Sequence, residues 1–92
     1  MAIATVKQGI AQVKRHIEKG AKTLSIAVID YPNDQYLVLV AFLYDDQGHG
    51  GMMINTFGKD FGKVLDFVVA NCGNPIEGPE VAVDMAKQAL KH

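Results

Sequence analysis

The sequence predicts an α+β fold: a single domain over residues 1–92 in which a three-stranded antiparallel meander packs with helices. Apolar residues recur at helical spacing in residues 2–19 and again in residues 58–71. Between these segments lie three short runs rich in β-branched and aromatic residues, separated by turn-forming residues. Because 92 residues leave room for one core, the predicted order is α-β-β-β-α-α within one domain.

The first predicted helix, residues 2–19, is defined by one narrow apolar stripe. Its members follow one another at spacings of three or four residues: Ile3, Val6, Ile10, Val13 and Ile17. This spacing is the period of one face of an α-helix. Gly20 stands where glycine commonly ends a helix. We expect the stripe to pack against the sheet.

The central predicted strand, Tyr36–Tyr44, contains nine residues and no charge. Successive side chains of a strand point to opposite faces, so this strand presents apolar side chains on both faces of the sheet. Each fully buried Val, Leu or Phe side chain contributes about 1.5–3 kcal/mol, and neither face is stable in water. The strand therefore predicts helices on both faces, or a helix on one face and a partner protein on the other.

The flanking strands differ in character. Thr23–Ile29 alternates between large and small residues. The small ones are predicted to share one face: Thr23, Ser25 and Ala27. This face leaves room for a closely packed element. The third predicted strand is Met52–Phe57, which polar residues interrupt.

Two helices are predicted after the sheet. The first, residues 58–71, has this apolar face: Phe61, Val64, Leu65 and Val68, followed by Cys72. The second begins at Pro79, a residue favoured at the first helical position. Its predicted buried side is mostly small: Ala82, Met85, Ala86, Ala89 and Leu90.

Charge is segregated along the chain although the net charge is only −1. Residues 1–22 carry five cations and one acid, whereas residues 23–57 carry four aspartates and no cation. A dipolar surface of this kind can steer a partner. The candidate contact residues are the cations of the first helix and of the segment after the sheet: Lys7, Lys14, Arg15, Lys19, Lys22, Lys59 and Lys63. They are expected to meet nucleic acid or an acidic protein surface, unless they only face solvent.

A second candidate contact is the acidic, glycine-rich turn of residues 45–51, which we expect to be exposed. Asp45, Asp46 and His49 are its chemically distinctive members.

No arrangement of residues points to catalysis, a metal or a cofactor. The lone serine, Ser25, lies inside a predicted strand rather than on a nucleophile turn. The three histidines are scattered without ligand spacing: His16, His49 and His92. His16 is expected to be solvated, and Cys72 is expected to be a small buried hydrophobe. The sequence therefore predicts a protein that is not an enzyme.

A reducing, cytoplasmic location is expected. A lone cysteine permits no disulfide within the chain, and the charged first twenty residues do not resemble a secretory signal. The longest apolar run has nine residues, about half the length of a membrane-spanning helix.

A compact chain of 92 residues with segregated charge and no catalytic residues resembles, in size and character, the small phage-encoded inhibitors of the anti-CRISPR kind. That resemblance implies stoichiometric binding to a host protein or ribonucleoprotein complex, with contact to an RNA or DNA backbone as one version. Two alternatives remain open. One is a structural or assembly protein that forms a homodimer through an apolar sheet face. The other is an accessory protein that binds nucleic acid.

Overall fold

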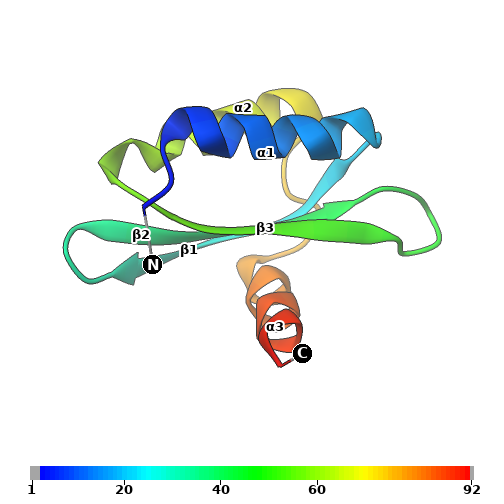
Figure 1. Ribbon diagram of the computed structural model, residues 1–92. Coiled ribbons are helices and arrows are strands. Elements are labelled where there is room, and N and C mark those ends of the chain that lie inside the picture. The colour runs from blue at the N-terminus through cyan, green and yellow to red at the C-terminus, as the bar shows by residue number, and fades with distance from the viewer. Residues whose placement is uncertain (1–2, 92) are drawn as a thin grey trace.

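The computed structural model describes residues 3–91 and confirms the predicted order and class. The elements are α1 (Val6–Glu18), β1 (Lys22–Tyr31), β2 (Gln35–Leu43), β3 (Gly50–Phe57), the 3-10 turn η1 (Lys59–Phe61), α2 (Gly62–Cys72) and α3 (Pro79–Leu90). The strands form one antiparallel sheet in the order β1-β2-β3 (Figure 1). Within residues 3–91, no helix has the length and apolar character needed to cross a membrane.

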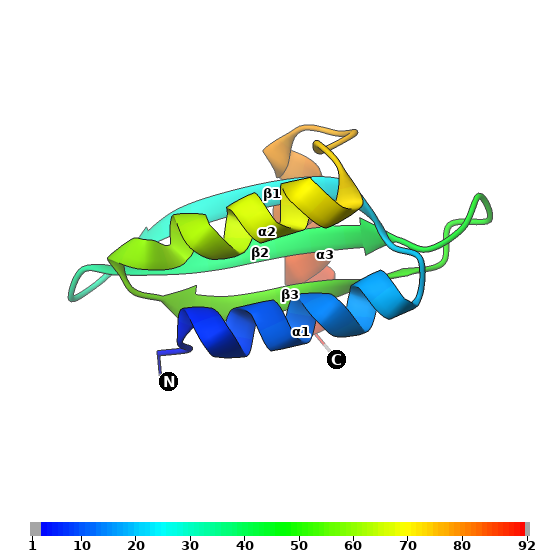
Figure 2. The ribbon, with the colours of Figure 1, turned by 90° about the horizontal axis from the view of Figure 1, so that it is seen from above.

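Helices cover both faces of the sheet. α1 and α2 run along the strands on one face, and α3 crosses the other face at a steep angle to the strands (Figures 1 and 2). We call α1, η1 and α2 together the helix layer. The alternation predicted for the central strand is confirmed, because Val40 and Phe42 belong to the core under the helix layer, whereas Leu39 and Ala41 belong to the core against α3.

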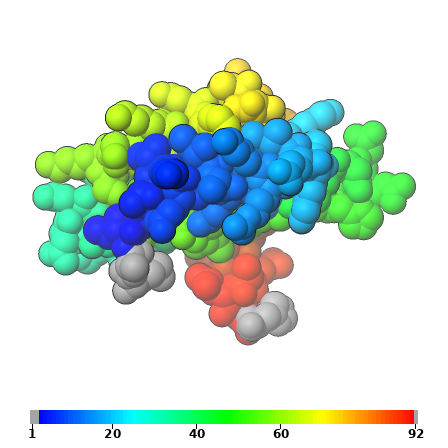
Figure 3. Space-filling view, turned by 45° about the horizontal axis from the view of Figure 1, so that its top comes forward, coloured from blue at the N-terminus to red at the C-terminus, as the bar shows by residue number. Residues whose placement is uncertain are grey.

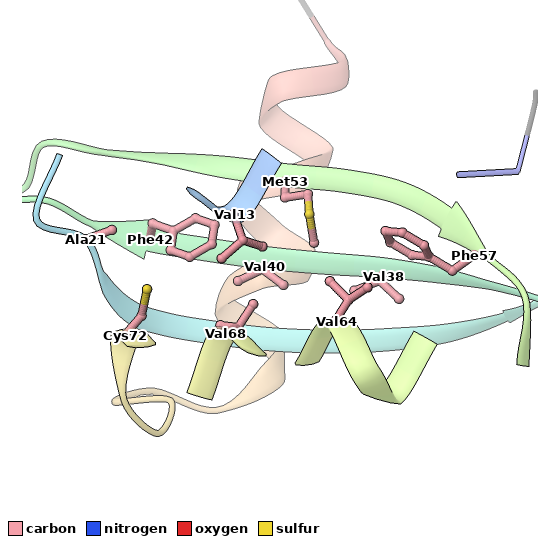
Figure 4. Packing of buried hydrophobic residues seen from close by; sticks show 10 residues of the cluster. All are labelled: Val13, Ala21, Val38, Val40, Phe42, Met53, Phe57, Val64, Val68 and Cys72. Atoms are coloured by element: carbon pink, nitrogen blue, oxygen red, sulfur yellow. The ribbon is translucent and has the colours of Figure 1, made fainter. Parts of the chain in front are cut away.

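The larger core lies between the helix layer and the sheet. Val13 of α1 and Val64 and Val68 of α2 are fully buried in this core. Figure 4 shows these side chains pointing at those of the sheet, including Met53 and Phe57. Cys72 closes one end of this core at 8% exposure, which confirms the expectation that it is a small buried hydrophobe.

The smaller core depends on small residues that let α3 approach the sheet. Ala82 and Ala86 of α3 pack against the core of Ala27, Leu39 and Ala41. The predicted burial of Ala89 and Leu90 is wrong: both are exposed, Leu90 at 77%. Because α3 crosses the strands instead of following them, its last turn passes beyond the sheet (Figure 2).

The buried hydroxyl of Ser25 ties the start of α3 to β1. It donates a hydrogen bond to the carbonyl of Gly78 at 2.6 Å and accepts one from the amide of Ala82 at 2.9 Å. Ala82 lies four residues after the N-cap Gly78, so its amide and the Gly78 carbonyl are the two groups that the first hydrogen bond of the helix would join. Ser25 therefore bridges the first turn of α3 from a strand that is distant in the sequence.

α1 begins later than predicted, because Thr5 and Gln8 form a capping box. The Thr5 hydroxyl accepts from the Gln8 amide at 3.1 Å, and the Gln8 side chain accepts from the Thr5 amide at 2.9 Å. Ile3 therefore lies outside the helix and is 47% exposed. The apolar stripe of the helix has four members rather than the predicted five.

A bulge in β1 changes the predicted face of two residues. Thr23 pairs with Phe42 and Ser25 pairs with Ala41, so Leu24 is the inserted residue. Paired residues share a face, which places Thr23 toward the helix layer, while Leu24 packs against the core of α3. The prediction that Thr23 shares the small face with Ser25 is therefore wrong, because the bulge interrupts the alternation.

Candidate functional site

The helix layer gathers most of the predicted cationic contacts on one surface of the molecule. Six cations stand on it or at its ends, and all are exposed: Lys7, Lys14, Arg15, Lys19, Lys59 and Lys63. Among residues 3–91, no lysine or arginine forms an ion pair. α1 occupies the centre and α2 the top of the space-filling view in Figure 3. These charges are available to a partner without the breaking of an ion pair.

The cations of α1 form two rows around the helix. At about 100° per residue, Lys7 and Lys14 lie within about 20° of each other around the helix, whereas Arg15 lies about 100° further round. Arg15 shares a shallow hollow of about 380 Å³ with Gln12 and Asn55 on the flank of α1 above β3. The side chain of Asn55 donates to that of Gln12 at 2.6 Å, which fixes this flank against the sheet.

Lys22 is separated from the other predicted cations, because it begins β1. It lines a hollow of about 250 Å³ together with Tyr44, Asp45 and Asp46. The structure therefore brings one residue of the basic set together with two of the acidic set. Lys19 bridges the two regions, with its ammonium 5.4 Å from the centre of the Tyr44 ring.

The acidic turn after β2 is organised by Asp45. One oxygen of its carboxylate accepts hydrogen bonds from the amides of Gln47 and His49 at 2.9 and 3.1 Å. The other lies 2.7 Å from Nδ1 of His49. The His49 side chain is the largest of several hydrogen-bonding contributions that lower the pKa of Asp45. The side chains are 72% exposed for His49 and 44% for Asp45, so the turn presents an ionised carboxylate and an imidazole to solvent.

His16 is placed differently from the expectation that it is solvated. Its ring stacks on that of Phe42 with centroids 4.2 Å apart, and its Nδ1 lies 2.7 Å from the hydroxyl of Tyr44. Burial, followed by the nearby Lys19 charge, lowers the pKa of His16. The sequence contained a signal for this position, because His16 lies about 60° from Val13 around the helix, at the margin of the apolar stripe.

Gly51 permits the contact between His16 and Tyr44. A β-carbon at this position would collide with the Tyr44 hydroxyl and lie 3.1 Å from the ring of His16. With a larger residue here, the Tyr44 hydroxyl would have to move from its position beside His16.

The described residues bring together neither a metal site nor an activated nucleophile. Residues 3–91 hold no group of three or more His, Cys, Asp or Glu side chains that could bind a metal ion. Burial raises the pKa of the Cys72 thiol, which disfavours the reactive thiolate. His92 lies outside the described residues. The chemistry that this surface offers is charge and hydrogen bonding.

No protein family, curated protein sequence or solved structure matches this chain. Its function is therefore inferred from its own surfaces: the basic helix layer, the acidic turns and the edges of the sheet.

Proposed function

We propose that this protein is a small binding protein that inhibits a host nucleoprotein complex stoichiometrically, in the manner of the anti-CRISPR proteins that it resembles. The basic helix layer is the surface that docks. The observation that carries the proposal is the concentration of exposed, unpaired cations on this one layer. Residues 3–21 and 58–73 carry six cations and three acids.

The remainder of the chain has the opposite charge. Residues 22–57 carry one lysine and four aspartates, and residues 74–91 carry two lysines and three acids. Because α3 lies on the face opposite α1 and α2, the two sides of the molecule differ in the sign of their charge (Figure 1). An anionic surface therefore attracts the helix layer first, and the orientation of the encounter is set before contact.

The binding should have the salt dependence of a phosphate interface. Each phosphate neutralised on a duplex contributes about −0.9 to the slope of log affinity against log salt. If four of the six cations make such contacts, the slope is about −4. Reversing two of them should weaken binding and bring the slope closer to zero by about 2.

The experiment begins with capture of the tagged protein's partner from bacterial lysate at low salt, with elution by salt. The identified complex is then purified, and its affinity is measured for the wild type, for Lys14→Glu with Arg15→Glu, and for a matched control. The control is Lys87→Glu with Lys91→Glu, which makes the same charge change on the α3 side. We expect the α1 variant to lose affinity and salt dependence and the α3 variant to retain both.

Equal effects of the two variants would show that net charge alone matters, and this would contradict docking by the helix layer. Binding to naked RNA or DNA as tight as to the captured complex would instead indicate the accessory nucleic-acid-binding function. Asp46→Lys in the turn after β2 tests the second contact candidate in the same assay. Loss of affinity in this variant, with an unchanged salt slope, would show that the turn contacts the protein part of the complex.

A further inference from the structure

The outer edge of β1 is covered at its start and open beyond it. The amide of Ile76 donates to the carbonyl of Thr23 at 3.2 Å, and that of Glu77 donates to the carbonyl of Leu24 at 2.8 Å. From Ser25 to Tyr31, β1 pairs with β2 on its inner side, and no other strand of residues 3–91 pairs with its outer side. β1 lies at the margin of the sheet in Figure 2.

This open edge is where the exposed apolar side chains gather. Residues 3–91 contain six exposed large hydrophobic side chains, and four of them lie on the edge or beside its covered start. They are Val28, Ile29, Tyr31 and Ile76, with exposures of 38%, 41%, 41% and 59%. The features that usually protect an edge strand are missing between Ser25 and Tyr31, since Asp30 is the only charged residue and no lysine or proline is present.

The direction of the backbone groups defines how a second strand would pair. The amide of Tyr44 donates to the carbonyl of His49 on the β3 side, so by alternation along β2 the backbone groups of Ala41, Leu39 and Leu37 face β1. Their partners on β1 face inward, and the residues between those partners, Ile26, Val28 and Asp30, therefore present their amides and carbonyls outward. An antiparallel copy of the same segment uses all of these groups only when Val28 pairs with its own counterpart and Ile26 pairs with Asp30. That register provides about six hydrogen bonds between the chains, two for each pair.

We propose that the open edge of β1 binds the same edge of a second copy of this chain, giving a homodimer with a continuous six-stranded sheet. The two copies are related by a two-fold axis at Val28, the isologous arrangement that most homodimers use. The axis is perpendicular to the sheet, so both helix layers lie on the same side of it. The dimer contact is an edge rather than the sheet face that the sequence suggested.

The charges and apolar groups of the edge suit a second copy. In this register Asp30 lies opposite Ile26, and the two Asp30 residues are offset by four positions, about 14 Å. That separation exceeds the Debye length of about 8 Å at physiological salt, so the two carboxylates repel each other weakly. Tyr31 of one copy lies opposite Ser25 of the other, next to the segment that carries the exposed Ile76. Each copy thus covers an apolar side chain of its partner.

The test is the mass of the purified protein in solution. Sedimentation equilibrium up to millimolar concentration should give twice the chain mass of 10.0 kDa for the wild type. Val28→Lys places two lysines directly opposite each other on the axis, where like charges oppose pairing, and should halve the mass. Val28→Glu should do the same. An equimolar mixture of the two variants should restore the dimer, because the introduced lysine of one chain then faces the introduced glutamate of the other.

Leu90→Lys is the matched control, because it places the same charge at an exposed apolar residue on α3. It should leave the mass unchanged, and circular dichroism should show that every variant is folded. A wild type that remains at the chain mass up to millimolar concentration would overturn the proposal. A dimer that survives Val28→Lys, or a mixture that does not reassemble, would overturn it as well. No partner enters this measurement, so the dimer and the docking of the helix layer can fail independently.

Discussion

Gly9 sits where α1 comes closest to the rest of the core, and Gly9→Ala tests how tightly that core is packed. An added β-carbon would lie 2.7 and 2.8 Å from two ring carbons of Phe57 and 2.9 Å from a methyl of Val64. Phe57 and Val64 are both 0% exposed. Neither side chain has solvent to move into, so the helix itself has to shift.

The magnitude follows from two opposing contributions. Carbon atoms pack best at about 3.5–4.0 Å, so the new methyl would overlap its neighbours by about 0.7 Å. Overpacking of this kind typically costs about 1–3 kcal/mol, and the immobile neighbours favour the upper half of that range. Alanine in the middle of a helix regains about 1 kcal/mol over glycine. The free energy of unfolding should therefore fall by about 1–2 kcal/mol, which lowers the Tm by about 4–16 °C in a domain of this size.

The assay is urea denaturation followed by circular dichroism, with Gly62→Ala as the matched control. Gly62 begins α2 with ordinary helical angles, and nothing lies within 4 Å of a β-carbon there. This second glycine-to-alanine change should raise stability by about 0.4–1 kcal/mol, because it restricts the unfolded chain without strain. The two substitutions thus have opposite expected signs. A Gly9→Ala variant as stable as the wild type, or more stable, would refute tight packing of α1 on the core.

Three further predictions concern polar groups. Ser25→Ala removes both hydrogen bonds that hold the start of α3, and unfolding measurements should show a loss of about 2–4 kcal/mol. Thr23→Val should be neutral or stabilising by up to about 1 kcal/mol, because this buried hydroxyl has no hydrogen-bond partner among residues 3–91; a large loss would contradict that placement. The lowered pKa of His16 favours the neutral imidazole in the folded state. The contribution of His16 to stability is therefore fully present above its unfolded pKa of about 6.5 and is lost as the pH falls through its folded pKa. His16→Phe keeps an aromatic ring on Phe42 but removes the titratable group. The difference in stability between wild type and variant should therefore change between about pH 8 and about pH 5. A difference that does not depend on pH would exclude this role of His16.

The placement of helices on both faces of the sheet could be predicted from the composition of the central strand. Nine uncharged residues between two turn sequences require apolar cover on both faces, and three amphipathic helices supply it. The register within β1 could not be predicted, since a single inserted residue, Leu24, reverses which face the preceding Thr23 occupies. The direction of α3 was also beyond the sequence pattern. Its small residues predict a close approach but not the angle, and that angle decides that Leu90 is exposed.

The candidate contacts were predictable only in part. The position of a residue along a helix predicts whether its side chain is exposed, but it does not predict which residues of other elements lie beside it. Exposed lysines on a helix follow from the apolar stripe opposite them, and those of α1 lie where the period places them. The grouping of Lys22 with Asp45 and Asp46 depends on the pairing of β1 with β2, which brings residues far apart in the sequence to one end of the sheet. The contact between His16 and Tyr44 has the same origin, because it joins residues 28 positions apart.

The size of the chain and the burial of the sheet together limit where this protein can bind anything. The side chains on both faces of β2 are buried in the two cores, and helices form the other side of each core. The faces of the sheet are therefore largely covered by the chain's own helices. The surfaces that remain are the outer side of the helices, the two hairpin turns and the two outer strands. The end of β3 is covered by a bridge between Ala4 and Phe57, and the start of β1 by residues 76–77. The open, apolar part of β1 and the unpaired cations of the helix layer point in different directions, so one molecule can use both at once. A dimer through β1 would place two basic layers side by side, and binding to an extended anionic partner would then gain from two linked contacts rather than one.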